Sequence, residues 1–337
     1  MRKSFTFFFA LAISANFTQA EVFKGECFDL LTWSLNTEDS TLIITGSGAM
    51  ANTSYRSAPW YDYRSYIVYL SLPDGLTSIG NYAFADCNRL TFVTIPNSVT
   101  SIGEWAFSDC YRLTSVTIPN SVNFLGKNVF AGCRSLTSVV IPDSVTSIGD
   151  GAFQNCSSFI SIEIPNRVTA IGNFVFHGCA SLISIDIPNS VTSIGVSAFQ
   201  DCSYLTSIEI PSNITSIGER AFEGCSSLAS ITNNTIIPQG IDSNVFGGNA
   251  VNLAVDKSAC TLYVPTESVD AYSTTSVWKD FTNIVGIDIS KETPDIPSSA
   301  PSVYTTPTNP AQKLIKDGNM YILSEDKTYT ITGKAVK

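Results

Sequence analysis

The chain repeats one block of sequence every 23 residues, seven times in succession and without an insertion. Cysteine, phenylalanine, glycine and proline each keep a fixed place in the block. The cysteines lie at Cys87, Cys110, Cys133, Cys156, Cys179, Cys202 and Cys225. A constant period of roughly 20 to 29 residues indicates a solenoid, in which each unit buries the face of its neighbour. A solenoid presents a long repeated surface, and such surfaces usually bind other molecules.

The unit from Leu113 to Gly126, with the sequence LTSVTIPNSVNFLG, shows how one coil forms. Its alternating pattern predicts a short strand, which ends at Pro119 because proline has no N–H for the ladder. Gly126 is expected to adopt a positive φ, and residues 127–133 are expected to form a short helical turn. Because every strand runs in the same direction, the sheet is expected to be parallel. The side chains expected to face inward are Leu113, Val116, Ile118, Val122 and Leu125.

The first twenty residues have the composition of a secretory signal peptide. Arg2 and Lys3 precede an apolar run from Phe5 to Ile13, and small residues lead to a cleavage site after Ala20. The apolar run is too short to span a bilayer. The mature protein is therefore expected to be secreted or displayed at the cell surface.

Beyond this signal peptide, changes in composition divide the chain into four further segments. Residues 21–66 are expected to form an N-terminal β cap that contains a hairpin, from 31–35 and 42–45. The solenoid with its C-terminal capping unit is expected over residues 67–290, with an irregular part at about 233–288. Residues 291–312 are rich in Pro, Ser and Thr, as linkers often are, and residues 313–337 alternate like a small β hairpin.

Nine cysteines in an exported chain would ordinarily indicate disulfide bonds. Here seven of them occupy one repeat position, so they are expected to stack in one column about 4.8 Å apart, as neighbouring strands do. Their Cβ vectors would then be parallel, whereas a disulfide needs them to converge. The sequence therefore predicts a ladder of buried free thiols. A zinc site is not indicated, since no CxxC motif is present.

The pattern Cys-x-x-Leu-Thr-Ser-Val-Thr-Ile-Pro-Asn-Ser-Val-Thr-Ser-Ile-Gly-x-x-Ala-Phe resembles the BspA-like leucine-rich repeat family of bacterial surface proteins. The likeness covers about residues 67–232, and the flanks at 27–66 and 260–287 resemble the ends of that family. It implies a β-rich α/β solenoid, a right-handed coil with a parallel sheet and short helical turns, capped at both ends. The last 25 residues are similar to short C-terminal sorting segments for type IX export to the bacterial surface.

Catalytic motifs are missing from the sequence. His177 is the single histidine and follows Phe176 at a repeat position that varies from Ala85 to Glu223, which is expected to be a solvated surface column. No HExxH, P-loop, GxGxxG or GxSxG motif occurs. The net charge of −10, with 19 basic residues, argues against a nucleic-acid partner. We expect no enzyme activity and no cofactor.

The outward side of the predicted sheet carries stacked carboxylates. Three successive coils place Glu163, Asp186 and Glu209 in one column, each beside a serine, namely Ser161, Ser184 and Ser207. Two such charges ~5 Å apart repel by roughly 1 kcal/mol in water. That repulsion favours a cation, either a basic side chain of a partner or a Ca²⁺ ion. The alternative is a hydrophilic face that only keeps a parallel sheet soluble.

A second candidate patch is aromatic and lies toward the N-terminal end of the repeats. Its members are Trp60, Tyr69, Tyr82, Phe92, Trp105 and Tyr111, with Arg89 and Arg112 nearby. Exposed rings beside basic groups suit the recognition of glycans or proteins. The alternative is that half of these rings seal the N-terminal cap.

The sequence thus favours a non-catalytic, surface-displayed binding protein. The family resemblance implies adhesion to host proteins, extracellular matrix or other cells through the face of the solenoid. The other open hypothesis is a glycan-binding component of a surface carbohydrate-capture system, which would use the aromatic patch.

Overall fold

A computed structural model gives the fold of residues 21–28, 30–247 and 254–288, and of the strands between residues 312 and 336. The chain forms two compact units, one that ends at Asp288 and one that begins at Ile289. The predicted signal peptide and residues 291–311 of the predicted linker lie outside the described residues. Within the described part, no helix has both the length and the apolar character needed to cross a membrane.

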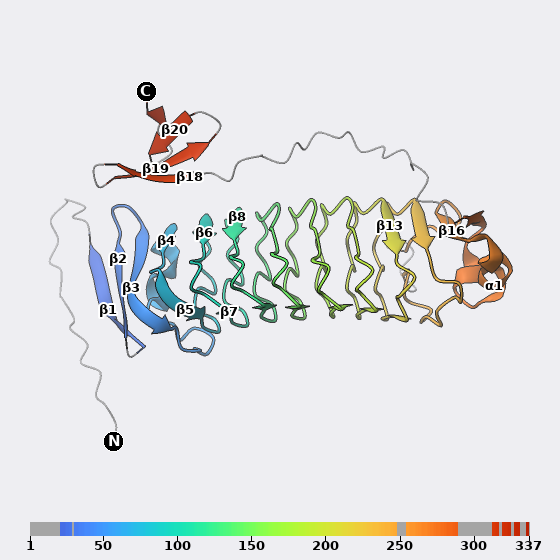
Figure 1. Cartoon of the computed structure of the whole chain (residues 1–337), viewed down its shortest axis with the longest axis horizontal. Helices are drawn as coiled ribbons and strands as arrows, with labels where there is room; N and C mark the ends of the chain where they lie inside the picture. Colours follow the sequence, from blue (N-terminus) through green and yellow to red (C-terminus); the bar gives the residue numbers. More distant parts are fainter. Residues whose placement is uncertain are drawn as a thin grey trace, which may run out of the picture. The chain divides into compact units, whose positions relative to one another are not determined.

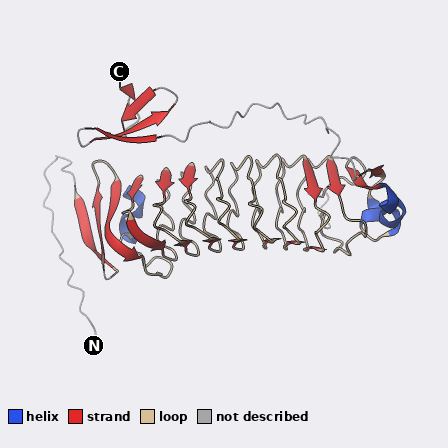
Figure 2. Ribbon diagram, in the orientation of Figure 1, coloured by secondary structure: helices blue, strands red, loops and turns tan. Residues whose placement is uncertain are grey.

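The first unit is a parallel β-solenoid of about nine turns with little helix, as the repeat predicts. Its coils lie side by side along the chain, and most of each coil is loop (Figure 1, Figure 2). Each coil contributes up to two short strands, and residues 23 apart pair in register, as Phe92 does with Ser115 and Ser193 with Ser216. The coils therefore form two parallel strand columns.

The first strand column forms what we call the outer sheet face. Its strands are β4 Tyr69–Ser71, β6 Phe92–Thr94, β8 Ser115–Thr117, β13 Ser207–Ile210, β15 Ser230–Asn233, β16 Thr261–Pro265 and β17 Asn283–Ile287. Single parallel bridges, Thr117 to Val140 and Glu163 to Asp186, continue the column between β8 and β13.

The second strand column follows the proline of each repeat. Its strands are β5 Gly75–Ile79, β7 Ser101–Ile102, β9 Phe124–Leu125, β10 Ser147–Ile148, β11 Ala170–Ile171, β12 Ser193–Ile194 and β14 Ser216–Ile217. Each two-residue strand turns one aliphatic side chain into the core, for example Ile102, Ile171 and Ile194.

An antiparallel sheet closes the N-terminal end. Strands β1 Val22–Cys27, β2 Leu31–Asn36 and β3 Thr41–Ala49 are antiparallel neighbours, so the predicted hairpin is present. Strand β3 then pairs in parallel with β4 and β5, which joins the cap to the first coil. The short 3₁₀ helix η1, Tyr61–Tyr66, follows β3. Open coil ends would expose core, and this sheet covers one of them.

Short helices close the C-terminal end. They are η2 Thr266–Ser268, α1 Val269–Thr274 and η3 Trp278–Asp280. Tyr272 and Trp278 are fully buried there. The Tyr272 hydroxyl donates to the Thr235 carbonyl oxygen (2.9 Å), and the Trp278 indole N–H donates to that of Gln239 (2.9 Å). These bonds fix the irregular coil that follows β15 against the cap.

Stacked phenylalanines form the centre of the core. Successive ring centroids lie 5.3 to 5.9 Å apart along the column Phe84, Phe107, Phe130, Phe153, Phe176, Phe199, Phe222 and Phe246. Trp60 stacks on the first ring and Trp278 packs edge-on against the last. The apolar column predicted from the repeat is thus continuous from cap to cap.

Two expectations about the turn of each coil are wrong. Gly126 does not have a positive φ; a Cβ added to it would lie 2.5 Å from the carbonyl carbon of Gly103 in the preceding coil. It is glycine because two backbones approach closely there. The positive φ values fall at Asn128 (53°) and Gly132 (75°), and residues 127–133 form tight turns in place of a helical turn.

The second unit is a small antiparallel sheet. Its strands are β18 Gln312–Lys316, β19 Asn319–Ser324, β20 Lys327–Thr330 and β21 Ala335–Val336, paired in chain order. The tail therefore has two strands more than the hairpin that its alternation indicated, because β20 and β21 extend the pairing.

Candidate binding surfaces

The outer sheet face places the predicted acidic residues in solvent. Ser161, Glu163, Ser184, Asp186, Ser207 and Glu209 are all exposed. The residues between them, Ile162, Ile185 and Ile208, are buried. This alternation follows from the strand period of two. The structure thus places the six residues on one surface, as the sequence indicated.

The three carboxylates stand in a row, one for each coil. Glu163 lies directly opposite Asp186 in the parallel ladder. Glu209, in β13, accepts a hydrogen bond from the Asn234 side-chain amide at 2.7 Å. Within residues 21–247 and 254–288, none of the three forms an ion pair with a basic side chain. Their charges are therefore not compensated by the described part of the chain.

The row does not have the geometry of a preformed Ca²⁺ site. Calcium takes about six to eight oxygen ligands that converge on one point. Each coil supplies only one carboxylate of the row, so the three do not converge on one point. Among the described residues, no group of three or more His, Cys, Asp or Glu side chains could hold a metal ion. A row of single carboxylates matches a row of basic side chains better than it matches one ion.

Exposed apolar side chains border this row. On the outer sheet face Val140 is 82% exposed, and Ile183 is 39% exposed beside Ser184. Past Asn234 the chain presents Ile236 and Ile237, the latter 80% exposed. An exposed apolar group of this size beside uncompensated charge is typical of a contact surface for another macromolecule.

The loop that presents Ile236 and Ile237 is held by buried hydrogen bonds. Thr235 bonds to the Asn233 side chain (2.9 Å), which donates to the Gln239 amide oxygen (3.0 Å). Ser268 donates to the carbonyl oxygen of Ile236 (2.8 Å). Sequence reasoning missed this loop as a site because it interrupts the repeat; the adjacent isoleucines within a polar stretch were the available signal.

The structure divides the predicted aromatic patch into separate places, and Trp60 is wrong as a surface residue. Trp60 is 1% exposed, stacks on Phe84 at 5.3 Å and donates its indole N–H to the carbonyl oxygen of Ala83 at 2.8 Å. It seals the N-terminal cap because the first ring of the phenylalanine column needs a cover. This agrees with the alternative that rings of this set close the cap.

Tyr69 and Phe92 lie on the outer sheet face, on neighbouring strands, with ring centroids 5.8 Å apart. Arg89 donates to the Ser65 carbonyl oxygen (3.3 Å). Tyr111 is exposed and lies under the Arg134 guanidinium at 5.0 Å, while Arg112 is exposed beside it. Tyr82 and Trp105 occupy a third place, the turn that follows the second strand column.

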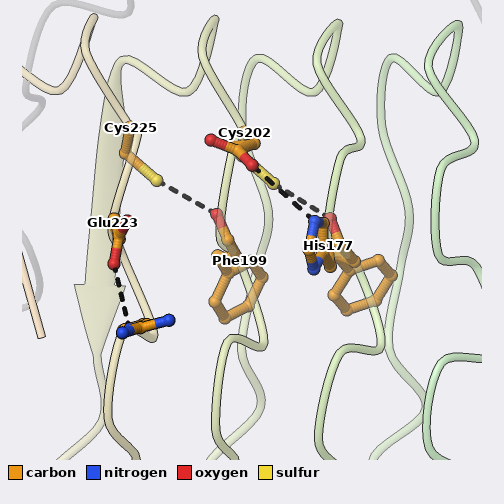
Figure 3. A network of polar contacts seen from close by, with 8 residues as sticks. His177, Phe199, Cys202, Glu223 and Cys225 are labelled. Atoms are coloured by element: carbon orange, nitrogen blue, oxygen red, sulfur yellow. Dashed lines mark hydrogen bonds and ion pairs between the residues drawn. The ribbon is translucent and has the colours of Figure 1, made fainter. Parts of the chain in front are cut away.

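The expectation that His177 lies in a solvated column is also wrong. The equivalent residues Ala85, Ser108 and Ala131 are buried, and the His177 side chain is 24% exposed. Its Nε2 lies 3.7 Å from the Asp201 carboxylate in the next coil (Figure 3). The position varies in sequence because it lies at the edge of the core, where side chains of several sizes fit. The Nδ1 atom of His177 is buried and has no hydrogen-bond partner among the described residues.

The cysteine column is the predicted ladder of buried free thiols. All nine cysteines are free and buried. Each thiol from Cys110 to Cys225 donates to the carbonyl oxygen of the phenylalanine 26 residues earlier, as Cys202 does to Phe176 and Cys225 to Phe199, both at 3.2 Å (Figure 3). Burial raises the pKa of the Cys179 thiol to about 12. These groups tie coil to coil and are poor nucleophiles.

Several solved structures of leucine-rich repeat proteins are similar to this chain, and the first described here shares its fold. A leucine-rich repeat protein from Bacteroides ovatus shares 21% identity over 81% of this chain and 77% of its own, with a TM-score of 0.53. The T. pallidum leucine rich repeat protein shares 30% identity over 51% of this chain and 86% of its own, with a TM-score of 0.41. A leucine rich cell surface protein from Faecalibacterium prausnitzii is 22% identical, with coverage of 81% and 100% and a TM-score of 0.26.

No curated protein matches the chain. A family model for the BspA type leucine rich repeat region matches in six copies, over residues 60–157 and 123–252. The matched span is more than half of the chain and contains the cysteine, phenylalanine and glycine columns described above. The chain belongs to the BspA type leucine rich repeat family.

Proposed function

We propose that this protein works at the bacterial cell surface by binding other proteins through its outer sheet face, without catalysis. The repeat family and the solenoid fold are typical of binding proteins, which supports the general class. The observation that carries the proposal is the row of Glu163, Asp186 and Glu209, whose charges no basic side chain of the described residues compensates. A row of this kind is complementary to a partner with a basic surface.

The partner also presents apolar groups in this proposal. Val140 lies in the same strand column as the row, Ile183 is exposed next to Ser184, and Ile236 and Ile237 follow Asn234, whose side chain binds Glu209. Basic side chains would contact the carboxylates, and aliphatic or aromatic side chains would cover the isoleucines. The proposed adhesion targets are host proteins, extracellular matrix proteins and proteins of neighbouring cells that combine these features.

Surface display is part of the proposal. The signal-like residues 1–20 would direct export, and the tail from residue 313 would direct sorting to the outer surface. The predicted linker, residues 291–312, between the solenoid and the tail would let many copies present the same face. Avidity would then strengthen a modest affinity for a partner that also occurs in many copies.

The test is a binding screen of the full mature chain against immobilised matrix and host-cell proteins, with and without Ca²⁺. A triple variant, Glu163→Gln, Asp186→Asn and Glu209→Gln, removes the charges of the row. Exposed ion pairs are worth about 0.2–1 kcal/mol each, so the affinity should fall roughly tenfold, and wild-type binding should weaken with salt. Addition of Ca²⁺ should not strengthen it.

The control changes three exposed carboxylates on the caps, Glu26, Glu38 and Glu267, to glutamine. This variant has the same net charge as the first and leaves the outer sheet face unchanged, so binding should persist. Equal loss in both variants would indicate a general charge effect, and unchanged binding in the first would rule out the row as the contact.

A further inference from the structure

The N-terminal cap ends in a free sheet edge, the strand β1. It is the outermost strand at this end of the first unit, and within the described residues it pairs with β2 alone (Figure 1). Its side chains Val22, Lys24 and Glu26 are exposed. An unpaired edge strand offers a row of backbone N–H and C=O groups to another strand. The chemistry of β1 therefore decides which strand could pair with it.

The hydrogen bonds of the cap show which backbone groups of β1 point to this edge. Thr37 donates its N–H to the carbonyl oxygen of Glu21 at 3.0 Å, so these two residues form a hydrogen-bonded pair of the β1–β2 ladder. Hydrogen-bonded pairs alternate along an antiparallel ladder, so every second residue counted from Glu21 bonds to β2. The residues between them, which include Lys24 and Glu26, direct their N–H and C=O groups to the free edge.

Charge within the cap sheet is confined to this edge strand. Lys24 and Glu26 are the only charged side chains in β1, β2 and β3. Neither forms an ion pair with another described residue. Both lie on the same side of the strand, because successive side chains alternate between its two sides. A lysine and a glutamate two residues apart are complementary to the same pair on a strand that runs in the opposite direction.

One antiparallel register matches these charges across two copies of β1. With Gly25 opposite Gly25, Lys24 of each copy lies opposite Glu26 of the other. The free backbone groups then meet, and each Lys24–Glu26 pair can exchange both of its N–H···O bonds. Opposite charges directly across a ladder are stabilising, and like charges are destabilising. A shift of two residues in either direction places Lys24 opposite Lys24 or Glu26 opposite Glu26, and a parallel in-register pair does both.

We propose that the protein forms a two-fold symmetric dimer in which β1 pairs antiparallel with β1 of a second copy. The contact is isologous, since each copy supplies the same strand. A second copy is the partner that the sequence of β1 favours, because this strand carries both charges of the pair in the order that its own reverse requires.

The dimer would align the outer sheet faces of its two copies. The outward side of β1 is continuous with the outer sheet face through β2 and β3, as the paired residues that lead from Lys24 to Ser71 show. Strands of one sheet share their outward side, so both outer sheet faces would point in the same direction. Two copies could then bind one partner surface together, with the gain in avidity that this brings.

The first test measures the oligomeric state of residues 21–337, without an N-terminal tag, by analytical ultracentrifugation. The wild type should dimerise with a Kd of roughly 100 µM or tighter, since one strand pair is a small interface. Lys24→Glu and Glu26→Lys should each be monomeric, because each places like charges across the ladder. An equimolar mixture of the two variants should dimerise again, because their charges are opposite in the mixed pair. Glu38→Lys, at an exposed cap residue outside β1, should dimerise like the wild type.

A disulfide test checks the register. Lys24→Cys and Glu26→Cys, mixed and oxidised, should give a cross-linked heterodimer, because the Cα atoms of a hydrogen-bonded pair lie about 5.5 Å apart, within the range of a disulfide. Either variant alone should cross-link much less, since the same position in the two copies is a diagonal neighbour at roughly 7–8 Å. The native cysteines are buried and should not take part.

Three results would overturn the proposal. The first is that the wild type stays monomeric up to about 0.5 mM, as expected if the charges of β1 only block the edge. The second is that Lys24→Glu and Glu26→Lys dimerise as well as the wild type, or that Glu38→Lys loses the dimer equally. The third is that the mixed cysteine variants cross-link no more than either alone. None of these results would affect the outer sheet face, because these variants leave it unchanged and a partner screen at nanomolar concentration uses monomers.

Discussion

The glycine column sets how closely the coils stack, and Gly149→Ala tests this. A Cβ at this position would lie 2.6 Å from the Lys127 nitrogen and 2.7 Å from the Gly126 carbonyl carbon. Real Cβ atoms essentially never approach other atoms within 3.0 Å. The preceding coil must therefore move by about 0.4 Å, the difference between 3.0 and 2.6, and its backbone cannot rotate away as a side chain could.

Overpacking of this kind costs roughly 1–3 kcal/mol. The unfolded chain offsets part of this, since replacing glycine with alanine reduces its conformational entropy by about 0.4–1 kcal/mol. We expect a net loss of about 1.3 kcal/mol, which corresponds to a melting temperature lower by roughly 3–5 °C for a domain of this size. Urea titration followed by circular dichroism would give the free energy of unfolding, and a thermal scan would give the melting temperature.

Gly240→Ala is the matched control. Nothing lies within 4 Å of a Cβ added at Gly240, and its φ is not positive. This variant should be as stable as the wild type or more stable by a few tenths of a kcal/mol. If Gly149→Ala were equally stable, the coils would not be held at the spacing described here, and the reasoning would fail.

Three further predictions concern the core, the thiols and the tail. Phe130→Ala should lower the free energy of unfolding by about 3–5 kcal/mol in urea titration, because the Phe130 ring is fully buried between two other rings. Phe124→Ala, which removes a ring that is 38% exposed, should lower it much less. The cysteines should not react with a thiol reagent at pH 8 until the protein is unfolded. The raised pKa of Cys179 stabilises the fold below the ordinary thiol value of 9.0, and this contribution is lost as the pH rises through about 12. The free energy of unfolding of Cys179→Ser should therefore fall less steeply with pH over that window than that of the wild type. An equal slope in the two proteins would contradict this. Deleting residues 313–337 should leave the solenoid folded, since the first compact unit ends at Asp288, but should stop surface display; normal display would rule out the sorting role.

The repeat allowed much of the fold to be predicted, because identical residues at a fixed period must take identical places. The burial of the cysteine and phenylalanine columns follows from their fixed place in the repeat, and the exposure of Glu163, Asp186 and Glu209 follows from the strand period. Register follows as well, since a shift of one residue would turn every isoleucine of the strand outward.

Contacts between coils were harder to foresee. The role of Gly126 depends on how near the preceding backbone lies, and sequence spacing does not contain that distance. Trp60 looked like a surface residue because it precedes the repeats, but the first ring of the core requires a cover. Ile237 lies in the coil that departs from the period, where the repeat gives no guidance.

Carboxylate footprinting of the complex with a partner protein would test the central claim most directly. The mature chain is labelled with a carbodiimide and glycine amide, free and partner-bound, and the labelled residues are identified by mass spectrometry. The proposal predicts that Glu163, Asp186 and Glu209 lose labelling in the complex while the cap residues Glu26 and Glu38 do not. Protection of the caps, with the row still fully labelled, would contradict binding through the outer sheet face.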